Sequence, residues 1–458
     1  MAGVATSAFK AATPPLPGPA VYRPRHPERT AFYKLFQDHF ERYLREYEDR
    51  FEPRHGPLRP VVRPTVEAYL ECGRLHGGFA RIRCPKCRAE HLLAFSCQTR
   101  NFCGSCQAKR AALFAEKLVT EILDPVPIRH IVFTIPRALR GLFERDRSLL
   151  GLLTRCAWDT LRTTFRAALG QPRAQAAAVL AVQTFGAYAA NFHPHVHGLA
   201  ADGLFLDDGR FLPLPPLEPR LLEEVFRRSL LTRLHRDGRL SEEFRDRLLT
   251  WSPSGFSAQA QPPLPPDDPR ARERLARYIL RGPLPADAVS LDRGGVLVRT
   301  PPHPRTGATA IILDPLFPRA TLHWSVAMRL GHAVRVQVEA GPFIHALTTQ
   351  IPDPRRHLVR YYGRWSPRTR GRRQPHTAKP PRDPTATACP PAPSRKASWA
   401  RMLRRVFEID PLLCPRCGSP MKILAVLTDP DVVFKIIRHL ERGGGDDPFD
   451  PRAPPPDP

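Results

Sequence analysis

The chain has 458 residues and an ordinary apolar fraction of 42%, which predicts two or three domains, each with a buried core. Its 70 Lys and Arg residues outnumber its 44 Asp and Glu residues, giving a net charge of +26. This excess favours a polyanionic partner, nucleic acid first, and no apolar run, basic amphipathic helix or lipidation signal supports a membrane. The N-terminus lacks the pattern of a signal peptide, so we expect a cytoplasmic protein whose ten cysteines are metal ligands or buried thiols.

The first third of the chain predicts a loose arm, a helix and a cysteine-rich region. Residues 1–28 are rich in Ala and Pro and are expected to form the arm. From Thr30 to about Phe51, apolar residues recur every three or four positions, which predicts a helix. After the cysteines, the sequence predicts a helix at 108–123, a buried strand at 128–135 and helices across 137–169.

The middle of the chain alternates strand-like and helical patterns, which is typical of an α+β fold. Strand-like runs cover 179–188 and 192–201, and Asp207-Asp208-Gly209 is a hairpin-type turn. Further segments follow in chain order: two charged amphipathic helices across 217–250, a short basic helix at 270–281, and strand-like runs at 288–300 and 308–314. Residues 364–398 have the composition of a linker. Trp399–His439 is expected to form a small last unit, and the residues from Gly443 onward are expected to form a disordered tail.

Two cysteine pairs predict a zinc ribbon. Cys84 and Cys87 form one C-x2-C pair, and Cys103 and Cys106 form a second after fifteen intervening residues. In a zinc ribbon, two tight turns with this spacing place four thiolates around one ion. Four thiolates leave no open coordination position, so we expect a structural zinc. The alternative, four buried free thiols, does not explain the double pairing.

Other possible zinc ligands have no paired partner. Cys72, His76 and Cys97 are close in sequence to the two pairs and form either a second zinc site or part of the core. Cys414 and Cys417 form a last C-x2-C pair with no partner pair downstream. That pair is either half of a ribbon, completed elsewhere in the chain or by a second chain, or a metal-free turn, and the sequence slightly favours the metal-free turn.

Basic residues surround the first two cysteine pairs, and Lys109 and Arg110 begin the helix that follows them. Arginine and lysine side chains gathered on one surface are typical of a face that contacts phosphates. A solvated charged surface is the alternative interpretation.

A run of histidines predicts a second kind of metal site. His195 and His197 are in a strand-like segment, so both side chains point to the same face, with Cα atoms about 6.6 Å apart. Two neutral imidazoles at this spacing can converge on one divalent ion. His193 shares the face and is a third ligand or a supporting residue, whereas Gln183 on the neighbouring strand-like run is another candidate for the third ligand. The alternative is that these are packed or surface histidines.

Tyr278 is the candidate nucleophile. It is in a short basic helix in which Arg274, Arg277 and Arg281 can hold a phosphate beside the phenol. A phenol with a pKa near 10 needs help from cations or from a polarised phosphate to react. A lone tyrosine on a helix is more often a core residue, and only its pairing with the histidine strand favours catalysis.

At this point the chain resembles transposases of the insertion-sequence-91 family and the related common-region elements, which belong to the HUH endonuclease superfamily. The resemblance covers residues 30–363 and 399–440. Four sets of residues carry it: Gly78–Arg81, Arg83-Cys84, Leu93–Cys97 and Phe102-Cys103 resemble the zinc-binding region; Phe192–Leu199 resembles the histidine strand; Arg277-Tyr278 with Arg281 and Pro283 resembles the nucleophile helix; and Arg355–Tyr361 resembles a segment after the catalytic core.

The resemblance implies a metal-dependent transposase that nicks and joins single-stranded DNA. His195 and His197 would hold Mg²⁺ or Mn²⁺ at the scissile phosphate, and Tyr278 would attack it to form a 5′-phosphotyrosine during rolling-circle transposition. Many members have two tyrosines one helical turn apart. Here Arg274 occupies the position four residues before Tyr278, so the chain resembles the single-tyrosine type. Tyr361 or Tyr362 could act instead, but their sequence context links neither to the metal.

The resulting fold expectation is an α+β chain with a zinc ribbon-like N-terminal domain, an HUH domain built on an antiparallel sheet with flanking helices, and a small C-terminal unit. The expected divisions in order are an arm at 1–28, a helical and zinc-binding domain for DNA at 29–110, a catalytic domain at 111–363, a linker at 364–398, a C-terminal unit at 399–442 and a tail at 443–458. We expect a bacterial protein that joins the nucleoid when bound to DNA. Its oligomeric state is left open.

Three alternatives explain part of the sequence. A replication initiator or relaxase would use the same chemistry on a different DNA end, although the ribbon and the flanking segments favour a transposase. A non-catalytic zinc-ribbon protein that binds DNA would leave His195, His197 and Tyr278 without a role. A zinc-dependent regulator that binds RNA explains the charge and the ribbon but not the histidine strand.

Overall fold

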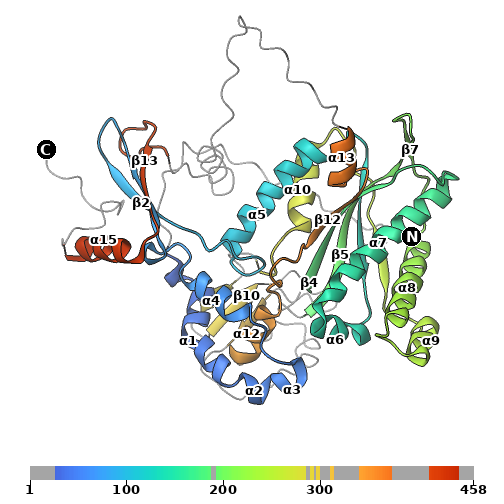
Figure 1. The fold of residues 1–458 in the computed structure, drawn as a ribbon, viewed down its shortest axis with the longest axis horizontal. Helices are drawn as coiled ribbons and strands as arrows, with labels where there is room; N and C mark the ends of the chain where they lie inside the picture. The colour runs from blue at the N-terminus through green and yellow to red at the C-terminus, as the bar shows by residue number, and fades with distance from the viewer. Residues whose placement is uncertain are drawn as a thin grey trace, which may run out of the picture. The chain divides into compact units, whose positions relative to one another are not determined.

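A computed structural model describes residues 26–186, 192–284, 289–292, 295–299, 310–313, 340–373 and 412–442 (Figure 1). The chain forms two compact units. The smaller one contains Gly78–Leu93 and the segment from Pro390 onward, and the larger one contains Arg25–Gly77 and Ala94–Cys389. Residues 1–25 of the expected arm, residues 374–398 of the expected linker and the whole expected tail lie outside the described residues.

These compact units divide the chain differently from the expected domains. Gly78–Leu93, within the domain expected at 29–110, belongs to the same compact unit as the C-terminal part of the chain. The described part of the expected C-terminal unit, residues 412–442, belongs to that compact unit as well. The remaining part of 29–110 belongs to the same compact unit as the expected catalytic domain. The physical reason is strand pairing over a long sequence separation, described below for the smaller unit.

The larger unit is organised around an antiparallel five-stranded sheet. Its strand order is β12 (Val359–Gly363), β4 (Ala177–Phe185), β5 (Phe192–Ala201), β3 (Ile128–Thr134) and β8 (Ser257–Ala260). β5 is the central strand, and β4 and β3 flank it on either side. In this register Gln183 of β4 is opposite His195, and Val132 of β3 is opposite His197.

Helices cover both faces of this sheet, because each strand alternates its buried side chains between two apolar cores (Figure 1). One face packs against α6 (Arg137–Arg145), α7 (Leu150–Leu169) and α8 (Pro219–Arg236), and α9 (Glu242–Thr250) follows α8. The opposite face packs against α5 (Gly104–Lys117), the π-helical turn η3 (Leu118–Ile122) and α10 (Pro269–Ile279). This second face carries His195 and His197.

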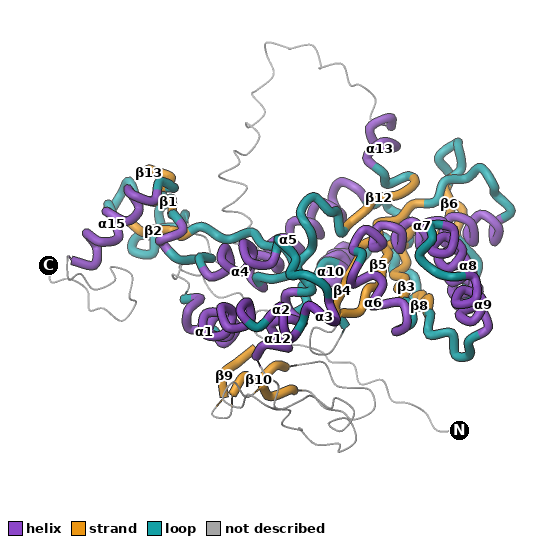
Figure 2. The backbone as a smooth tube through the Cα atoms, turned by 60° about the horizontal axis from the view of Figure 1, so that its bottom comes forward, coloured by secondary structure: helices purple, strands orange, loops and turns teal. Residues whose placement is uncertain are grey.

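An aromatic helical cluster forms another core in the larger unit. It contains α1 (Ala31–Arg45), α2 (Tyr47–Arg50), α3 (Glu52–His55), α4 (Val62–Leu70) and α12 (Ala340–Thr348) (Figure 2). Tyr33, Phe36, Tyr43 and Tyr69 are almost fully buried in it. The single helix expected from Thr30 to Phe51 is divided at Glu46. Pro53, which lacks a backbone N–H, is the second residue of the separate turn of α3.

Short elements complete the larger unit. β6 (Gly203–Phe205) and β7 (Phe211–Pro213) form the expected hairpin, and Gly209 in its turn has φ of 90°. β9 (Val289–Asp292), β10 (Gly295–Arg299) and β11 (Ala310–Leu313) form a second antiparallel sheet. The remaining elements among the described residues are α13 (Pro367–Arg373) and three 3₁₀ turns, η1 (Pro27–Arg29), η2 (Leu75–Gly77) and η4 (Arg147–Leu149).

The smaller unit is a three-stranded sheet with one described helix. Its strand order is β13 (Lys422–Leu427), β1 (Phe79–Arg83) and β2 (Glu90–Ala94), and α15 (Pro430–Arg442) follows β13. β1 and β13 are antiparallel, with Phe79 opposite Leu427 and Arg83 opposite Lys422. More than 300 residues separate these paired strands. None of the described helices combines the length and the hydrophobicity that a membrane crossing needs.

Candidate active site and zinc centres

The centre of β5 carries the histidine pair. His195 and His197 point to the same face of the sheet and are 7% and 3% exposed. Their Nε2 atoms are 3.0 Å apart. Two nitrogen ligands at right angles, each about 2.1 Å from an ion, would be separated by about 3.0 Å. The pair is therefore spaced as two neighbouring ligands of one divalent ion.

The other nitrogen of each ring has a hydrogen-bond partner of its own. His195 Nδ1 is 2.7 Å from the backbone oxygen of His193, and His197 Nδ1 is 2.9 Å from Nε2 of His130 on β3. Metal-binding histidines in proteins usually donate their second N–H to such a partner, which fixes the tautomer and the ring orientation. In this arrangement each Nε2 atom keeps a lone pair for an ion, and the two atoms are 3.0 Å apart.

Burial keeps these imidazoles neutral. It lowers the pKa of His195 and of His130 to about 4 and, together with His195 and other nearby groups, the pKa of His197 to about 2. A neutral imidazole is the form that binds a metal ion. Near neutral pH the pair is ready to coordinate without first losing a proton.

Gln183 has the geometry of a third ligand. It is opposite His195 in the register, so its side chain is on the same face of the sheet. Its Nε2 donates to the backbone oxygen of Ile279 at 3.0 Å and approaches that of Tyr278 at 3.4 Å. Carbonyl partners require an N–H donor, which assigns the amide orientation. Its Oε1 is buried and has no hydrogen-bond partner among the described residues, so it is free to bind an ion.

His193 supports the site from the start of the strand. Burial and the nearby Arg140 lower its pKa to about 3, and its ring is 5.2 Å from that of His195 between centroids. Its Nε2 is buried without a partner among the described residues. The backbone oxygen of His193 forms the hydrogen bond that orients His195. The structure thus gives His193 a positioning contact and leaves its imidazole available.

Tyr278 is beside the histidine pair. It is near the end of α10, is 42% exposed, and has its ring centroid 5.4 Å from that of His197 and 5.8 Å from that of His130. Both ring pairs meet edge to face. Tyr361 and Tyr362 are instead on the edge strand β12, where they pack against the two cores. Of these three candidate tyrosines, only Tyr278 contacts the histidines.

The arginines of α10 are placed differently from one another. The guanidinium carbon of Arg281 is 4.9 Å from the ring centre of Tyr278, and its Nε has no partner among the described residues. Arg277 forms a 2.6 Å ion pair with Glu273, and Arg274 is exposed. Arg281 is therefore the arginine best placed to meet a phosphate beside the phenol.

A second arginine near the site is absent from the sequence predictions. Arg140 of α6 is close enough to lower the pKa values of His193 and His195. It is half-buried, and its Nε has no partner among the described residues. On α5, Arg110 donates to the backbone oxygen of Gln98, and Lys109 is partly buried.

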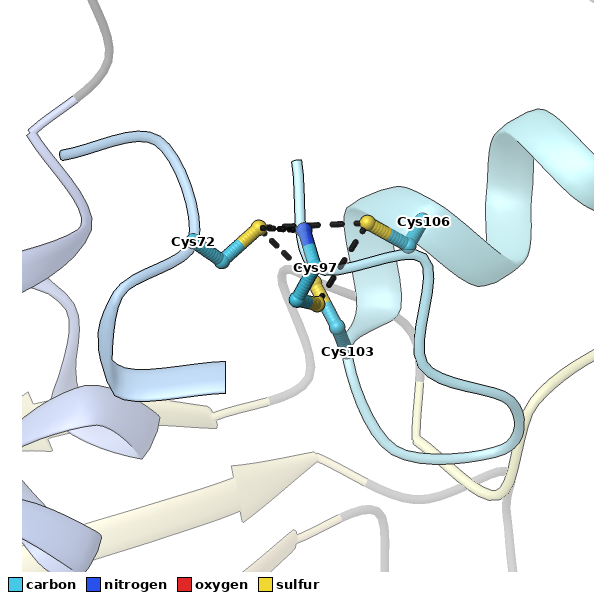
Figure 3. A group of neighbouring side chains, drawn as sticks. All are labelled: Cys72, Cys97, Cys103 and Cys106. Atoms are coloured by element: carbon cyan, nitrogen blue, oxygen red, sulfur yellow. Dashed lines mark hydrogen bonds between the residues drawn. The ribbon is translucent and has the colours of Figure 1, made fainter. Parts of the chain in front are cut away.

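Four cysteines converge in the larger unit (Figure 3). Cys72 follows α4, Cys97 and Cys103 lie in the loop before α5, and Cys106 is in the first turn of α5. The Sγ of Cys72 is 3.8 Å from those of Cys103 and Cys106, and Cys97 Sγ is 3.6 Å from Cys106 Sγ. Four sulfurs at the Zn–S distance of 2.3 Å in a tetrahedron would be about 3.8 Å apart.

Four other cysteines converge in the smaller unit. The turn of Cys84 and Cys87, between β1 and β2, meets the turn of Cys414 and Cys417, before β13. Sγ atoms are 3.6 Å apart between Cys84 and Cys417 and 3.4 Å apart between Cys87 and Cys414. This arrangement is a ribbon made of two paired turns, completed by a distant part of the same chain.

The expected grouping of Cys84 and Cys87 with Cys103 and Cys106 is therefore wrong. The two pairs are 15 residues apart in sequence but lie in different compact units, because β1 and β2 carry the first pair to β13. Cys414 and Cys417 belong to a complete set of four thiols rather than to an isolated turn. His76 is exposed on η2 and belongs to neither set.

A third group of possible ligands contains His55, Glu144 and His345, whose ligand atoms lie within 4.8 Å of one another. The Nδ1 of His55 is 3.2 Å from the Glu144 carboxylate. Arg59 and Arg147 are close enough to lower the pKa of His345. Two neighbouring cations disfavour a metal ion here. The His55–Glu144 hydrogen bond, the contact between the His55 and His345 rings and the hydrogen bond between His345 and Tyr43 explain the geometry of the group.

Two family models match parts of the chain. Residues 35–135 match the family described as "Transposase zinc-binding domain", and residues 177–373 match the family described as "Putative transposase". The first range contains the cysteine set of Figure 3 and His130, and the second contains Gln183, the histidine pair and Tyr278. No curated protein and no solved structure shows significant similarity to the chain.

Proposed function

The chain belongs to the insertion-sequence-91 family of transposases, and from this premise we propose that it nicks and joins single-stranded DNA through Tyr278. DNA is the partner that the family implies. The observation that carries the proposal is the convergence of the two Nε2 atoms, the unpartnered Oε1 of Gln183 and the ring of Tyr278 on one face of the sheet. We further propose that this chemistry serves rolling-circle transposition in the bacterial cytoplasm.

We propose that His195, His197 and Gln183 hold one Mg²⁺ or Mn²⁺ ion. A divalent ion at this position would polarise a phosphate oxygen and stabilise the charge that develops in the transition state. His130 and the backbone oxygen of His193 orient the two imidazoles, and the carbonyls at the end of α10 orient the Gln183 amide. These contacts fix the ligand atoms before DNA binds, which lowers the cost of assembling the site.

In the proposed step, the Tyr278 oxygen attacks the phosphorus and the bond to the 3′ oxygen breaks. The phosphate stays on the 5′ side as a phosphotyrosine, the phenol loses its proton, and the released 3′ oxygen gains one. Arg281 is placed to offset negative charge beside the phenol. Attack by a 3′-OH of target DNA reverses the step and joins the strands. The phosphoester bond is conserved throughout, so the reaction needs no nucleoside triphosphate.

A single tyrosine carries this scheme. The position one helical turn before Tyr278 is Arg274, which is exposed, and Tyr361 and Tyr362 are on β12. Cleavage and joining therefore occur in sequence at one nucleophile in our proposal. Two simultaneous phosphotyrosines on one chain are not part of it.

We also propose one structural zinc ion in each four-cysteine set. The family of the zinc-binding domain and the sulfur spacings of 3.4–3.8 Å support this assignment. Four thiolates fill the tetrahedral shell, so neither ion would have an open position for DNA or water. The zinc ions would hold the loops before α5 and β13 in place and take no part in strand transfer.

The proposal is tested by incubating the full-length chain with Mn²⁺ and labelled single-stranded DNA that carries an element end. We expect a covalent protein–DNA product that survives denaturation. The change Tyr278→Phe should abolish it, because the ring remains but the nucleophile is lost. His195→Ala combined with His197→Ala should also abolish it, and Tyr361→Phe is the matched control that should retain it.

Two results would count against the proposal. A covalent product in Tyr278→Phe would rule out the assigned nucleophile. DNA binding without any covalent product, in the presence of Mg²⁺ or Mn²⁺, would favour a zinc-dependent DNA-binding protein without nicking activity.

A further inference from the structure

A basic cleft is present in the larger unit, on the opposite face of β4 from Gln183. Val182 and Thr184 of β4 line it, and because side chains alternate along a strand, they point away from the face that carries the histidine pair. Arg147, Arg356 and Arg360 line the same cleft from three different segments of the chain. It is partly open to solvent.

One arginine of the cleft, Arg59, has hydrogen-bond partners within the protein for both of its terminal nitrogens. Arg59 donates to the backbone oxygens of Thr348 and Ile351 and to the carboxylate of Asp353, all at 2.8–2.9 Å. These bonds hold the turn that follows α12. Arg59 thus neutralises Asp353, the acidic residue that lines the cleft.

The guanidinium groups of the other three arginines of the cleft have fewer partners among the described residues. The Nε of Arg147 donates to the backbone oxygen of Glu144, and its guanidinium carbon is 4.2 Å from the ring centre of Phe192. No hydrogen bond or ion pair of the terminal nitrogens of Arg147, Arg356 or Arg360 to another described residue is present. Glu144 and Asp353 are the carboxylates close enough to raise the pKa of Arg147, and Glu144 is 3.2 Å from Nδ1 of His55. Arg356 is likewise close to Asp146, which is paired with Arg239. Arginines therefore outnumber carboxylates around the cleft, and Asp146 already has an arginine partner of its own.

Burial makes the positive charge of Arg147 energetically unfavourable. Its pKa falls to about 9, because the side chain is largely removed from water and Arg59 is nearby. A guanidinium in such surroundings gains more from an anionic partner than an exposed one does. The cleft is thus predisposed to bind an anion.

The backbone is shaped to bring these groups together. Gly151 of α7 approaches Arg360 so closely that a Cβ atom built there would be 2.8 Å from Nη2 of Arg360. On the other side, Arg100 donates to the backbone oxygens of Asp353 and Arg356. Between them Arg355 has φ of 58°, a left-handed conformation that is uncommon for a residue with a side chain. Both features place guanidinium groups at the cleft.

We infer that this cleft binds a backbone phosphate of the single-stranded DNA on which the chain acts. The inference rests on the proposed function for the identity of the strand. Arginine forks suit phosphate, and three of them from separate segments can surround one group. Arg140 near the histidine pair and Arg147 in the cleft are on α6 and the turn directly after it, so one short segment supplies cations to both places. A strand that passes the end of the sheet can meet both.

The test uses the full-length chain with Tyr278→Phe, which binds DNA without cutting it. The affinity for a labelled single-stranded oligonucleotide is measured by fluorescence anisotropy over a range of salt concentrations. Adding Arg360→Gln is expected to weaken binding about tenfold at low salt and to reduce the slope of log K against log salt by about 0.7, the value for one phosphate contact with a single strand. Arg236→Gln, an exposed arginine of α8, is the matched control.

A second variant keeps the charge and moves it. Gly151→Ala places a methyl group against the end of Arg360, a flexible side chain that can shift, while alanine favours the helix. We expect weaker DNA binding with an unchanged or higher melting temperature. An oligonucleotide series with one neutral methylphosphonate at successive positions locates the contact. One methylphosphonate position should weaken DNA binding by the Tyr278→Phe chain. In the chain that also has Arg360→Gln, a methylphosphonate at that position should weaken binding no further.

Binding that stays within twofold in both variants, with the same salt slope as Arg236→Gln, would overturn the inference. So would a methylphosphonate profile that Arg360→Gln leaves unchanged. The assay is independent of the reaction. If the wild-type chain forms no covalent product but the effect of Arg360→Gln persists, the nicking proposal fails and the phosphate site stands.

Discussion

His130 is a residue-scale feature with a direct consequence for the metal. Its Nε2 is 2.9 Å from Nδ1 of His197, and the two rings are nearly parallel, with an interplanar angle of 2°. Removal of such a hydrogen-bond partner typically lowers metal affinity 10- to 100-fold. We expect His130→Ala to raise the Mn²⁺ concentration at half-maximal product formation by about that factor. Saturating Mn²⁺ should recover most of the rate.

Two comparisons make the His130 prediction specific. His130→Gln retains a hydrogen-bonding side chain and should lose less metal affinity than His130→Ala. His235→Ala, on α8 away from the sheet face, should leave the Mn²⁺ titration unchanged. Equal Mn²⁺ dependence in His130→Ala and the wild-type chain would show that His130 does not contribute to metal binding.

His345 gives a prediction for pH. Burial lowers its pKa to about 3, with smaller contributions from the nearby His55, Arg59 and Arg147. In the unfolded chain it takes up a proton near pH 6.5, whereas in the folded chain it stays neutral. The unfolded state therefore binds more protons between these pH values, and the free energy of unfolding falls as the pH drops below 6.5.

The change His345→Gln should remove part of this acid sensitivity. We expect the loss of stability between pH 7 and pH 4 to be smaller in the variant by about 1–3 kcal/mol, measured by denaturant unfolding. His76→Gln, at an exposed position on η2, is the control and should keep the wild-type slope. The same slope in all three proteins would show that His345 does not stay neutral in the fold.

At the scale of elements, α5 connects the cysteine set of Figure 3 to α10, the helix that carries Tyr278. Cys106 is in the first turn of α5, and the next residue, Gln107, donates from Nε2 to the backbone oxygen of Leu280 at 2.7 Å. Its Oε1 accepts from the backbone N–H of Asn101 at 3.1 Å. One buried side chain therefore joins the cysteine loop to the end of α10, two residues beyond Tyr278.

Replacing Gln107 by Ala should affect both stability and reaction rate. Two buried backbone groups would lose their partner, at a cost of about 1–3 kcal/mol each in the free energy of unfolding. Because Tyr278 depends on the position of α10, we also expect the rate of product formation to fall at saturating Mn²⁺. Lys117→Ala, at an exposed position on the same helix, is the control for both measurements. A destabilised Gln107→Ala protein with a normal rate of product formation would show that the Gln107 contact does not position Tyr278.

Local patterns predicted most elements of the larger unit but not their contacts. The β-branched run at 128–135 and the histidine run at 192–201 are strands β3 and β5, since strand formation depends on local alternation and turn signals. The role of His130 could not be read from the sequence, because it depends on the register between β3 and β5. Its one signal was a histidine in a predicted strand whose other residues, apart from Arg129 and Thr134, are apolar.

At the scale of the whole molecule, the cysteine pairing shows why spacing alone misled the sequence prediction. Cys84 and Cys87 have two possible partner pairs, one close in sequence and one more than 300 residues away. Spacing favours the near pair, whereas β1 pairs with β13 and selects the distant one. The zinc class and the identity of most of the ligands could be predicted from C-x2-C pairs. Their division into two sites required the tertiary structure.

Zinc content tests this division. In a chain with His195→Ala and His197→Ala, which removes the histidine site, we expect two zinc ions per chain by elemental analysis. Adding Cys414→Ser and Cys417→Ser should reduce the content to one, as should adding Cys103→Ser and Cys106→Ser instead. A single ribbon of Cys84, Cys87, Cys103 and Cys106 would give one zinc ion, and the C-terminal changes would then have no effect.

The central claim is that Tyr278 becomes covalently bound to the 5′ phosphate of a cleaved strand, and mass spectrometry of the purified protein–DNA product tests it most directly. Digestion with trypsin after Arg277 and Arg281 isolates the peptide Tyr278-Ile279-Leu280-Arg281. We expect this peptide, after nuclease treatment, to carry the residual nucleotide mass on Tyr278. Nucleotides attached to a peptide with Tyr361 or Tyr362, or cleaved DNA with a free 5′ phosphate and no attached peptide, would contradict the account.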